Sequence, residues 1–230
     1  MKNILTDFRS AVLFITTLPA GKNIAYSPMG MIKFFPFVGL ILGAGLILFD
    51  ALVSWLWPPG VAAVLDVIFL VVVTGAFHLD GLGDTADGLF SHRSRSRALE
   101  IMKDSRTGMM GLVAVFCTLA VKAAGIYSIK TGENLFQILT LFLIIPAYSR
   151  TAMIFGIKFL NYGRAKVGTG LDLFEKDIGL KDFGFFLIPV VISLSLASAN
   201  SSSNFIYPPP FNFRFDFHSS SSNEFYGCWK

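Results

Sequence analysis

The chain has 230 residues, of which 53% are hydrophobic and 15% are charged, with a formal net charge of +4 and a mean hydropathy of +0.63. A soluble domain carries roughly 25% charged residues, so this composition excludes a soluble protein, a disordered chain and a fibrous repeat. Two cysteines cannot build a disulfide framework, and no Cys/His spacing indicates zinc. The small basic excess is typical of charges that orient membrane proteins, not of nucleic-acid binding. The sequence therefore predicts an integral membrane protein.

The predicted elements begin with a short apolar run, Ala11–Leu18, which cannot span a bilayer and lacks the layout of a signal peptide. We expect an interfacial or re-entrant helix there. Five longer stretches follow, each about as long as a helix that crosses a hydrocarbon core roughly 30 Å thick. They are Phe34–Trp57, Val61–Phe77, Met109–Ile129, Leu135–Ile157 and Phe183–Ala199. The predicted fold is an all-α polytopic membrane bundle of about five spans plus an interfacial N-terminal helix.

Charged residues are rare inside these stretches and are limited to Asp50, Asp66, Lys122 and Arg150. A transporter would place acids midway through its spans, as Asp50 and Asp66 are. However, neither acid recurs in an obvious repeat, and no inverted duplication is visible. We therefore expect capping or tertiary pairing to explain these two acids.

The connecting segments carry basic residues in an alternating pattern. They number four in residues 1–33, none in 58–60, five in 78–108, one in 130–134 and five in 158–182. Cytoplasmic loops of membrane proteins carry the excess of Lys and Arg. The pattern predicts five spans with the N-terminus, residues 78–108 and residues 158–182 in the cytoplasm.

The segment after the second stretch carries three regularly spaced acids. Asp80, Asp84 and Asp87 are spaced i, i+4, i+7, which places them within about 60° of one another on a helix. Three carboxylates on one stripe repel each other unless a cation intervenes, and a hard divalent ion bound through carboxylates, water and substrate phosphate is the usual solution. The alternative is a solvated acidic face paired with nearby basic residues. On the opposite face, His78 is better explained as a structural or hydrogen-bonding residue than as a metal ligand.

A second polar segment, Arg97–Gly108, follows the acidic stripe. Asp104 adds a carboxylate, and Arg106 is able to bind phosphate oxygens bidentately. Taken alone, the segment reads as a short amphipathic connector. Beside three aspartates, the mixture of acids and guanidinium indicates phosphoryl transfer.

These residues resemble adenosylcobinamide-GDP ribazoletransferase, the cobalamin synthase family. The resemblance lies in residues 78–90 (HLDGLGDTADGLF), in residues 97–108, and in the openings FITTLP at 14–19 and FPFVGL at 35–40. Ser149-Arg150 in the fourth stretch also fits, whereas Gly83 stands where the family usually has alanine. The resemblance covers about residues 5–197.

The resemblance implies a magnesium-dependent enzyme of the cytoplasmic membrane, with its active site facing the cytoplasm. A hydroxyl of α-ribazole, or of its 5′-phosphate, would attack the cobinamide-side phosphate of adenosylcobinamide-GDP and expel GMP. The implied catalytic residues are Asp80, Asp84, Asp87, Asp104 and Arg106. The first three are also the metal ligands, and Arg106, Ser149 and Arg150 are the implied substrate-binding residues. Which carboxylate acts as the general base stays open.

The last part of the chain departs from this resemblance. Residues 200–230 contain no Leu, Val or Ala, and include serine and proline runs. The family continues with more membrane helix and a GG-x-TGD-x-LG segment, which this chain lacks. We therefore expect residues 1–199 to form an incomplete transferase domain, residues 200–230 to be an unstructured tail foreign to the family, and the chain as written to be a poor enzyme.

A CDP-alcohol phosphotransferase is the alternative enzyme, because it also uses spaced aspartates at a membrane boundary. Its usual motif has Ala-Arg after the first Asp-Gly and a longer spacing between the acids. The segment from Asp80 to Asp87 has neither feature.

Overall fold

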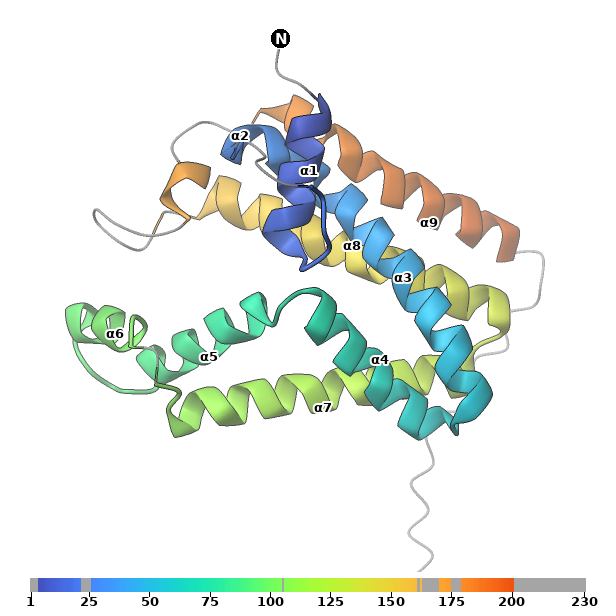
Figure 1. Ribbon diagram of the computed structural model, residues 1–230, viewed down its shortest axis with the longest axis horizontal. Coiled ribbons are helices and arrows are strands. Elements are labelled where there is room, and N and C mark those ends of the chain that lie inside the picture. Colours follow the sequence, from blue (N-terminus) through green and yellow to red (C-terminus); the bar gives the residue numbers. More distant parts are fainter. Residues whose placement is uncertain are drawn as a thin grey trace, which may run out of the picture.

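The computed structural model describes residues 4–21, 26–104, 106–160, 162, 170–174 and 179–200. Within these ranges every regular element is helical, which confirms the all-α prediction (Figure 1). The elements are α1 (Ile4–Ile15), α2 (Pro28–Met31), η1 (Ile32–Phe34), α3 (Phe35–Leu56), α4 (Pro59–Val73), α5 (Phe77–Leu89), α6 (Arg95–Ile101), α7 (Met109–Gly132), α8 (Leu135–Phe159), η2 (Leu171–Leu173), η3 (Leu180–Phe186) and α9 (Leu187–Asn200). Of the predicted tail, residues 200–230, Asn200 ends α9, and residues 201–230 lie outside the described residues.

Several helices have the length and apolarity of membrane spans. Three helical segments are long and apolar enough by themselves, namely Pro28–Leu56, α7 and α8. The helix α4 is long enough only together with α5, and the two are bent by 91°. The fifth predicted stretch contains a shorter apolar helix, Phe183–Ser195. The chain is therefore a multi-pass membrane protein, but its described part holds three uninterrupted spanning helices, or four with the bent pair, where hydropathy predicted five.

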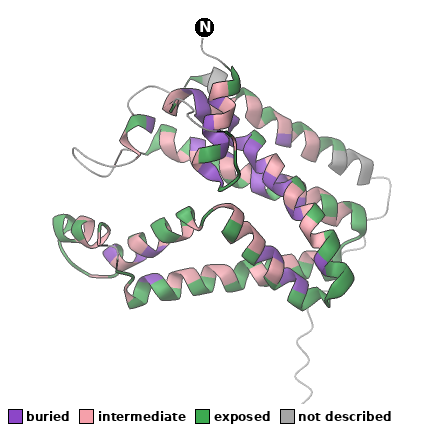
Figure 2. Cartoon of the chain, in the orientation of Figure 1, coloured by how far each residue is buried: buried purple, intermediate pink, exposed green. Residues whose placement is uncertain are grey.

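The packed core lies where α1, α3 and α8 meet (Figure 2). A Cβ atom on Gly39 or Gly43 would overlap the α8 backbone at Ala147 or Leu143, so this Gly-x-x-x-Gly pair lets α3 and α8 approach closely. The N-terminal helix begins at Ile4, before the predicted Ala11. Its buried face joins the core, and its buried Asp7 accepts a 2.6 Å hydrogen bond from Ser27 and lies 3.5 Å from Lys33 Nζ.

The predicted span Val61–Phe77 is wrong as one helix, because the chain breaks between α4 and α5. Gly75 and Ala76 both have left-handed backbone conformations, with φ of 61° and 56°. Their N–H groups donate to the carbonyls of Val72 and Val71, which is the Schellman ending of a helix. Thr17, which follows α1, donates its N–H to Val73 O at 2.7 Å and its hydroxyl to the same oxygen at 3.2 Å. The backbone carbonyls at the break thus accept hydrogen bonds, including those from Thr17, as backbone groups in the membrane interior must.

Asp50 and Asp66 form ion pairs, as expected. Lys130 of α7 contacts Asp50 on α3 and lies 3.2 Å from Asp66 on α4, which is fully buried. Ser54 donates to Asp50 at 2.8 Å. This cluster joins three helices and accounts for both acids, which removes the main observation in favour of a transporter.

Candidate active site

The three acids of the sequence motif lie on α5, which is helical from Phe77 to Leu89 as predicted. The spacing therefore places Asp80, Asp84 and Asp87 on one face of this helix. Asp80 is exposed, whereas Asp84 and Asp87 are half-buried. The acidic stripe is thus a real feature of the folded chain, and its members differ in environment.

Asp87 caps the start of α7. Its two carboxylate oxygens accept hydrogen bonds from the backbone N–H groups of Gly108 (2.6 Å) and Gly111 (2.7 Å). Gly108 is the N-cap residue of α7, so the carboxylate satisfies helix-terminal donors and lies at the positive end of the helix dipole. A Cβ on Gly111 would overlap both Asp87 and the carbonyl of Gly83, so α5 and α7 approach closely only because this residue is glycine. The spacing of the acids along the chain does not reveal this cap.

The predicted magnesium site is only partly matched by the arrangement of the carboxylates. Among the described residues, no three His, Cys, Asp or Glu side chains gather closely enough to hold a metal ion. Mg²⁺ in enzymes usually keeps several waters and takes one or two carboxylates plus substrate phosphates. Asp80 and Asp84, one helical turn apart, fit this smaller requirement, whereas Asp87 already binds two backbone groups.

Asp104 and Arg106 form an exposed pair in the connection between α6 and α7. The Arg106 guanidinium donates from Nε to Asp104 Oδ1 at 3.0 Å and from Nη2 to Oδ2 at 2.6 Å. These hydrogen bonds lower the pKa of the Asp104 carboxyl to about 2. The Arg106 side chain is 87% exposed, so its guanidinium is accessible to a ligand that can replace Asp104.

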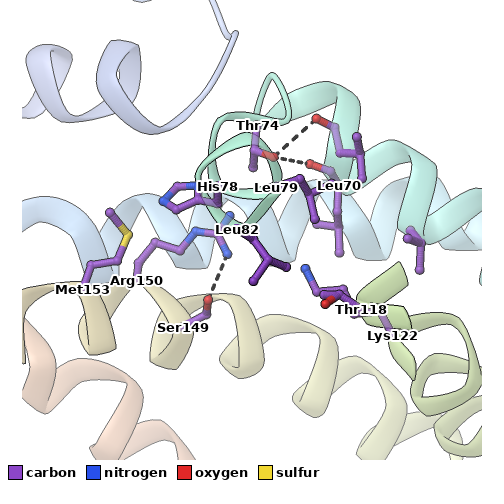
Figure 3. Close-up of a pocket in the computed structure, with 12 residues that line it drawn as sticks. Leu70, Thr74, His78, Leu79, Leu82, Thr118, Lys122, Ser149, Arg150 and Met153 are labelled. Carbon is purple, nitrogen blue, oxygen red and sulfur yellow. Dashed lines mark hydrogen bonds between the residues drawn. The ribbon is translucent and has the colours of Figure 1, made fainter. Parts of the chain in front are cut away.

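Ser149 and Arg150, the other predicted site residues, line a cavity of about 190 Å³ beside the α4–α5 break (Figure 3). The remaining walls come from α4, α5 and α7, and include His78 and Lys122. Arg150 Nη1 lies 3.4 Å from Ser149 Oγ, while its buried Nε has no hydrogen-bond partner within the described structure. Figure 3 shows the guanidinium of Arg150 below the His78 ring and the amino group of Lys122 pointing toward the same space from α7.

The cavity and the acidic stripe occupy different faces of α5. His78, Leu79 and Leu82 face the cavity and lie about 100–160° around the helix axis from Asp80. Because Thr118 and Lys122 line the same cavity, α5 begins beside the middle of α7, not at its end. The predicted residues therefore form three groups, which are the α5 stripe, the Asp104–Arg106 pair and the cavity. Lys122 was missed as a site residue, and its only sequence signal was a charge inside an apolar stretch.

Residues 7–208 match the sequence profile of the family described as cobalamin-5-phosphate synthase. The chain belongs to this family. The matched range includes the acidic stripe, the Asp104–Arg106 pair and the cavity, so all three groups of residues lie in the part of the chain that resembles the family. No solved structure matches the chain significantly.

Curated relatives within this family carry the name adenosylcobinamide-GDP ribazoletransferase. One from Clostridium botulinum (strain Okra / Type B1) is 34% identical over 199 residues, which cover 84% of this chain and 77% of the relative. One from Alkaliphilus metalliredigens is 38% identical, covering 70% of this chain and 64% of the relative. One from Listeria monocytogenes (strain ATCC BAA-679 / EGD-e) is 36% identical, covering 69% and 64%. The chain thus spans just under two thirds of the length of the second and third relatives and about three quarters of the first.

Proposed function

We propose that this protein is an adenosylcobinamide-GDP ribazoletransferase that catalyses a late step of cobalamin biosynthesis. A hydroxyl of α-ribazole, or of its 5′-phosphate, attacks the cobinamide-side phosphorus of adenosylcobinamide-GDP. A new P–O bond forms, the bond to the GMP phosphate breaks, and the hydroxyl proton passes to a base. The observation that carries the proposal is the family match over residues 7–208, which includes the aspartate face of α5. The names of the relatives support the same reaction.

The α5 carboxylates could bind a diphosphate substrate through a magnesium ion that links the two. Asp80 and Asp84 would hold the ion, which when bound supplies positive charge for the diphosphate and the leaving GMP. Asp87 has a different role in this proposal, because its cap on α7 fixes α5 against the helix that follows the Asp104–Arg106 pair. It is a positioning residue for the other two acids.

Arg106 is proposed to bind phosphate oxygens of the donor. Its guanidinium already forms a bidentate pair with a carboxylate, and a phosphate presents a similar pair of oxygens. Asp104 is a poor candidate for the general base as long as Arg106 pairs with it, because a carboxyl with a pKa of about 2 holds a proton weakly at neutral pH. Asp80 and Asp84 are the carboxylates proposed for that role.

The protein is proposed to lie in the cytoplasmic membrane, with its active site facing the cytoplasm. The support is the alternation of basic residues between segments, with five in residues 78–108 and none in residues 58–60. Nucleotide substrates such as adenosylcobinamide-GDP are cytoplasmic, which favours the same orientation.

The test is product analysis with purified protein in detergent. Adenosylcobinamide-GDP and α-ribazole or its 5′-phosphate are supplied with magnesium, and GMP and the corrinoid product are measured. We expect equimolar GMP and cobalamin (or cobalamin 5′-phosphate), dependent on the acceptor and abolished by a chelator. GMP released at the same rate without the acceptor would indicate a hydrolase and contradict the proposal.

A further inference from the structure

Two cations, Lys122 and Arg150, line one cavity of the helical bundle, and among the described residues no carboxylate lines it with them. Lys122 lies near the middle of α7, and Arg150 lies on α8. Within the described part of the chain, neither forms an ion pair with an acidic side chain, and the one hydrogen bond of the Arg150 guanidinium there goes to the Ser149 hydroxyl. Lys130, two turns further along α7, shows the contrast, because it pairs with both Asp50 and Asp66.

Unbalanced cations at this depth are unfavourable and are typical of binding sites. Charged side chains in membrane segments are costly unless they meet an opposite charge, and those that persist usually face a cavity and bind a ligand. Here the two cations also repel each other, because they line the same space. An anion between them would remove both penalties.

The cavity limits what that anion is. Its volume of about 190 Å³ is below the roughly 300–1,000 Å³ of sites that enclose a whole small-molecule ligand. It therefore suits one charged group of a larger molecule and excludes a corrinoid or a complete nucleotide. Lys122 and Arg150 are donors of the kind that bind phosphate, and the hydroxyls of Thr74, Thr118 and Ser149 lie on the same walls.

We propose that Lys122, Arg150 and His78 form a phosphate subsite within the membrane bundle, on the face of α5 opposite the aspartates. The subsite binds a phosphate group of one of the two substrates, and so rests on the proposed function for the source of that group. The 5′-phosphate of a phosphorylated acceptor is the group that agrees with the proposed function, because that function places the donor diphosphate on the aspartate face; the donor diphosphate is the other source that the kinetics below distinguish. Because the cavity and the aspartate stripe lie on different faces of one helix, α5 would separate the anchored group from the metal-binding carboxylates.

A binding measurement tests the subsite without the enzymatic reaction. The melting temperature of the purified protein is measured in a maltoside detergent, which carries no phosphate, with and without inorganic pyrophosphate, and with EDTA present to exclude magnesium. We expect a rise of about 2–4 °C for the wild type that is lost in Lys122→Met and Arg150→Met. The matched control, Lys158→Met, removes a cation from the end of α8 outside the cavity and should keep the rise. Lys122→Arg, which retains the charge, should also keep it.

The binding measurement can succeed or fail independently of the proposed function. A rise that depends on Lys122 and Arg150 supports the subsite even in a protein that releases no GMP, in which case the proposed function alone would fail. No rise in the wild type, or an equal rise in Lys122→Met and Lys158→Met, overturns the subsite. If Lys122→Met does not fold, His78→Gln replaces it in the test. A smaller rise in melting temperature than in the wild type then supports the subsite, and an unchanged rise contradicts it.

Steady-state kinetics then identify the source of the phosphate. If it belongs to the acceptor, Lys122→Met should raise KM about 10- to 100-fold for α-ribazole 5′-phosphate and leave KM for α-ribazole unchanged, since a charge-assisted hydrogen bond is lost with only one of them. If it belongs to the donor, KM for adenosylcobinamide-GDP should rise with either acceptor. Unchanged KM values for all three substrates would overturn the proposal.

Discussion

Asp87 Oδ1 accepts a 2.7 Å hydrogen bond from the backbone N–H of Gly111, across the contact between α5 and α7. Its other oxygen binds the N–H of Gly108, so one side chain satisfies two donors at the start of a membrane helix. The acid at the end of the motif therefore holds α5 against the start of α7.

Replacing Asp87 should destabilise the protein as well as reduce its activity. We expect Asp87→Ala to lower the free energy of unfolding by about 1–2 kcal/mol, because two helix-terminal donors lose their acceptor. Asp87→Asn should lose less, since its amide oxygen can still accept one bond. Thermal denaturation in detergent measures both variants. A melting temperature for Asp87→Ala equal to that of the wild type would show that the cap contributes nothing.

Gly111→Ala should disturb the α5–α7 contact, because the added Cβ would overlap Asp87 and the Gly83 carbonyl. We expect a loss of about 1–3 kcal/mol in stability, the usual range for overpacking, together with reduced GMP release. Gly125→Ala on the same helix is the matched control, since its Cβ would meet nothing within 4 Å. This control should be neutral or slightly stabilising, as alanine favours helix. Equal melting temperatures for the two variants would refute the close contact.

The pH dependence of activity should not report the titration of Asp104. Arg106 lowers the Asp104 pKa to about 2, below the ordinary value of about 3.9. The ion pair is therefore complete above about pH 4 and is lost only as pH falls through about 2, so the carboxylate is charged throughout an assay from about pH 5 to 9. We expect Asp104→Asn to lower the rate of GMP release without moving the acid limb of the pH–rate profile. A displaced limb would mean that Asp104 is the titrating base.

The orientation of the chain is tested by cysteine labelling in intact cells. Both native cysteines, Cys117 and Cys228, are first replaced by alanine. A cysteine at Ser96 on α6 should then react with an impermeant thiol reagent only after permeabilisation, because we expect this segment to be cytoplasmic. A cysteine at Gly60, in the first turn of α4, should react in intact cells. The reverse pattern would invert the topology.

Hydropathy predicted the long helices well, and it failed where local geometry interrupts an apolar run. The predicted stretch Leu135–Ile157 compares with an observed helix from Leu135 to Phe159, because an apolar run of this length has no competing structure in lipid. The break at Gly75 was missed, since the apolar residues continue through it. Only the left-handed backbone at Gly75 and Ala76, and the hydrogen bonds from Thr17, reveal it.

The candidate site was predicted in part. The spacing of the acids correctly placed them on one helical face, but spacing cannot distinguish a metal ligand from a helix cap, so the role of Asp87 was not foreseen. The cavity joins Lys122 with Arg150, which lies on the next helix along the chain. Such pairings depend on how helices pack, which one sequence does not encode in any local pattern.

Asp80 and Asp84 are proposed to form the reactive, metal-dependent face of a ribazoletransferase. The decisive experiment measures the rate of GMP release from adenosylcobinamide-GDP and α-ribazole, as a function of magnesium, for the wild type, Asp80→Asn and Asp84→Asn. Lys158→Met is the control for altered surface charge. We expect each Asn variant to lose more than tenfold in rate and to require more magnesium, while its melting temperature stays near that of the wild type. Wild-type rates and magnesium dependence in the Asp80→Asn/Asp84→Asn double variant would contradict the claim.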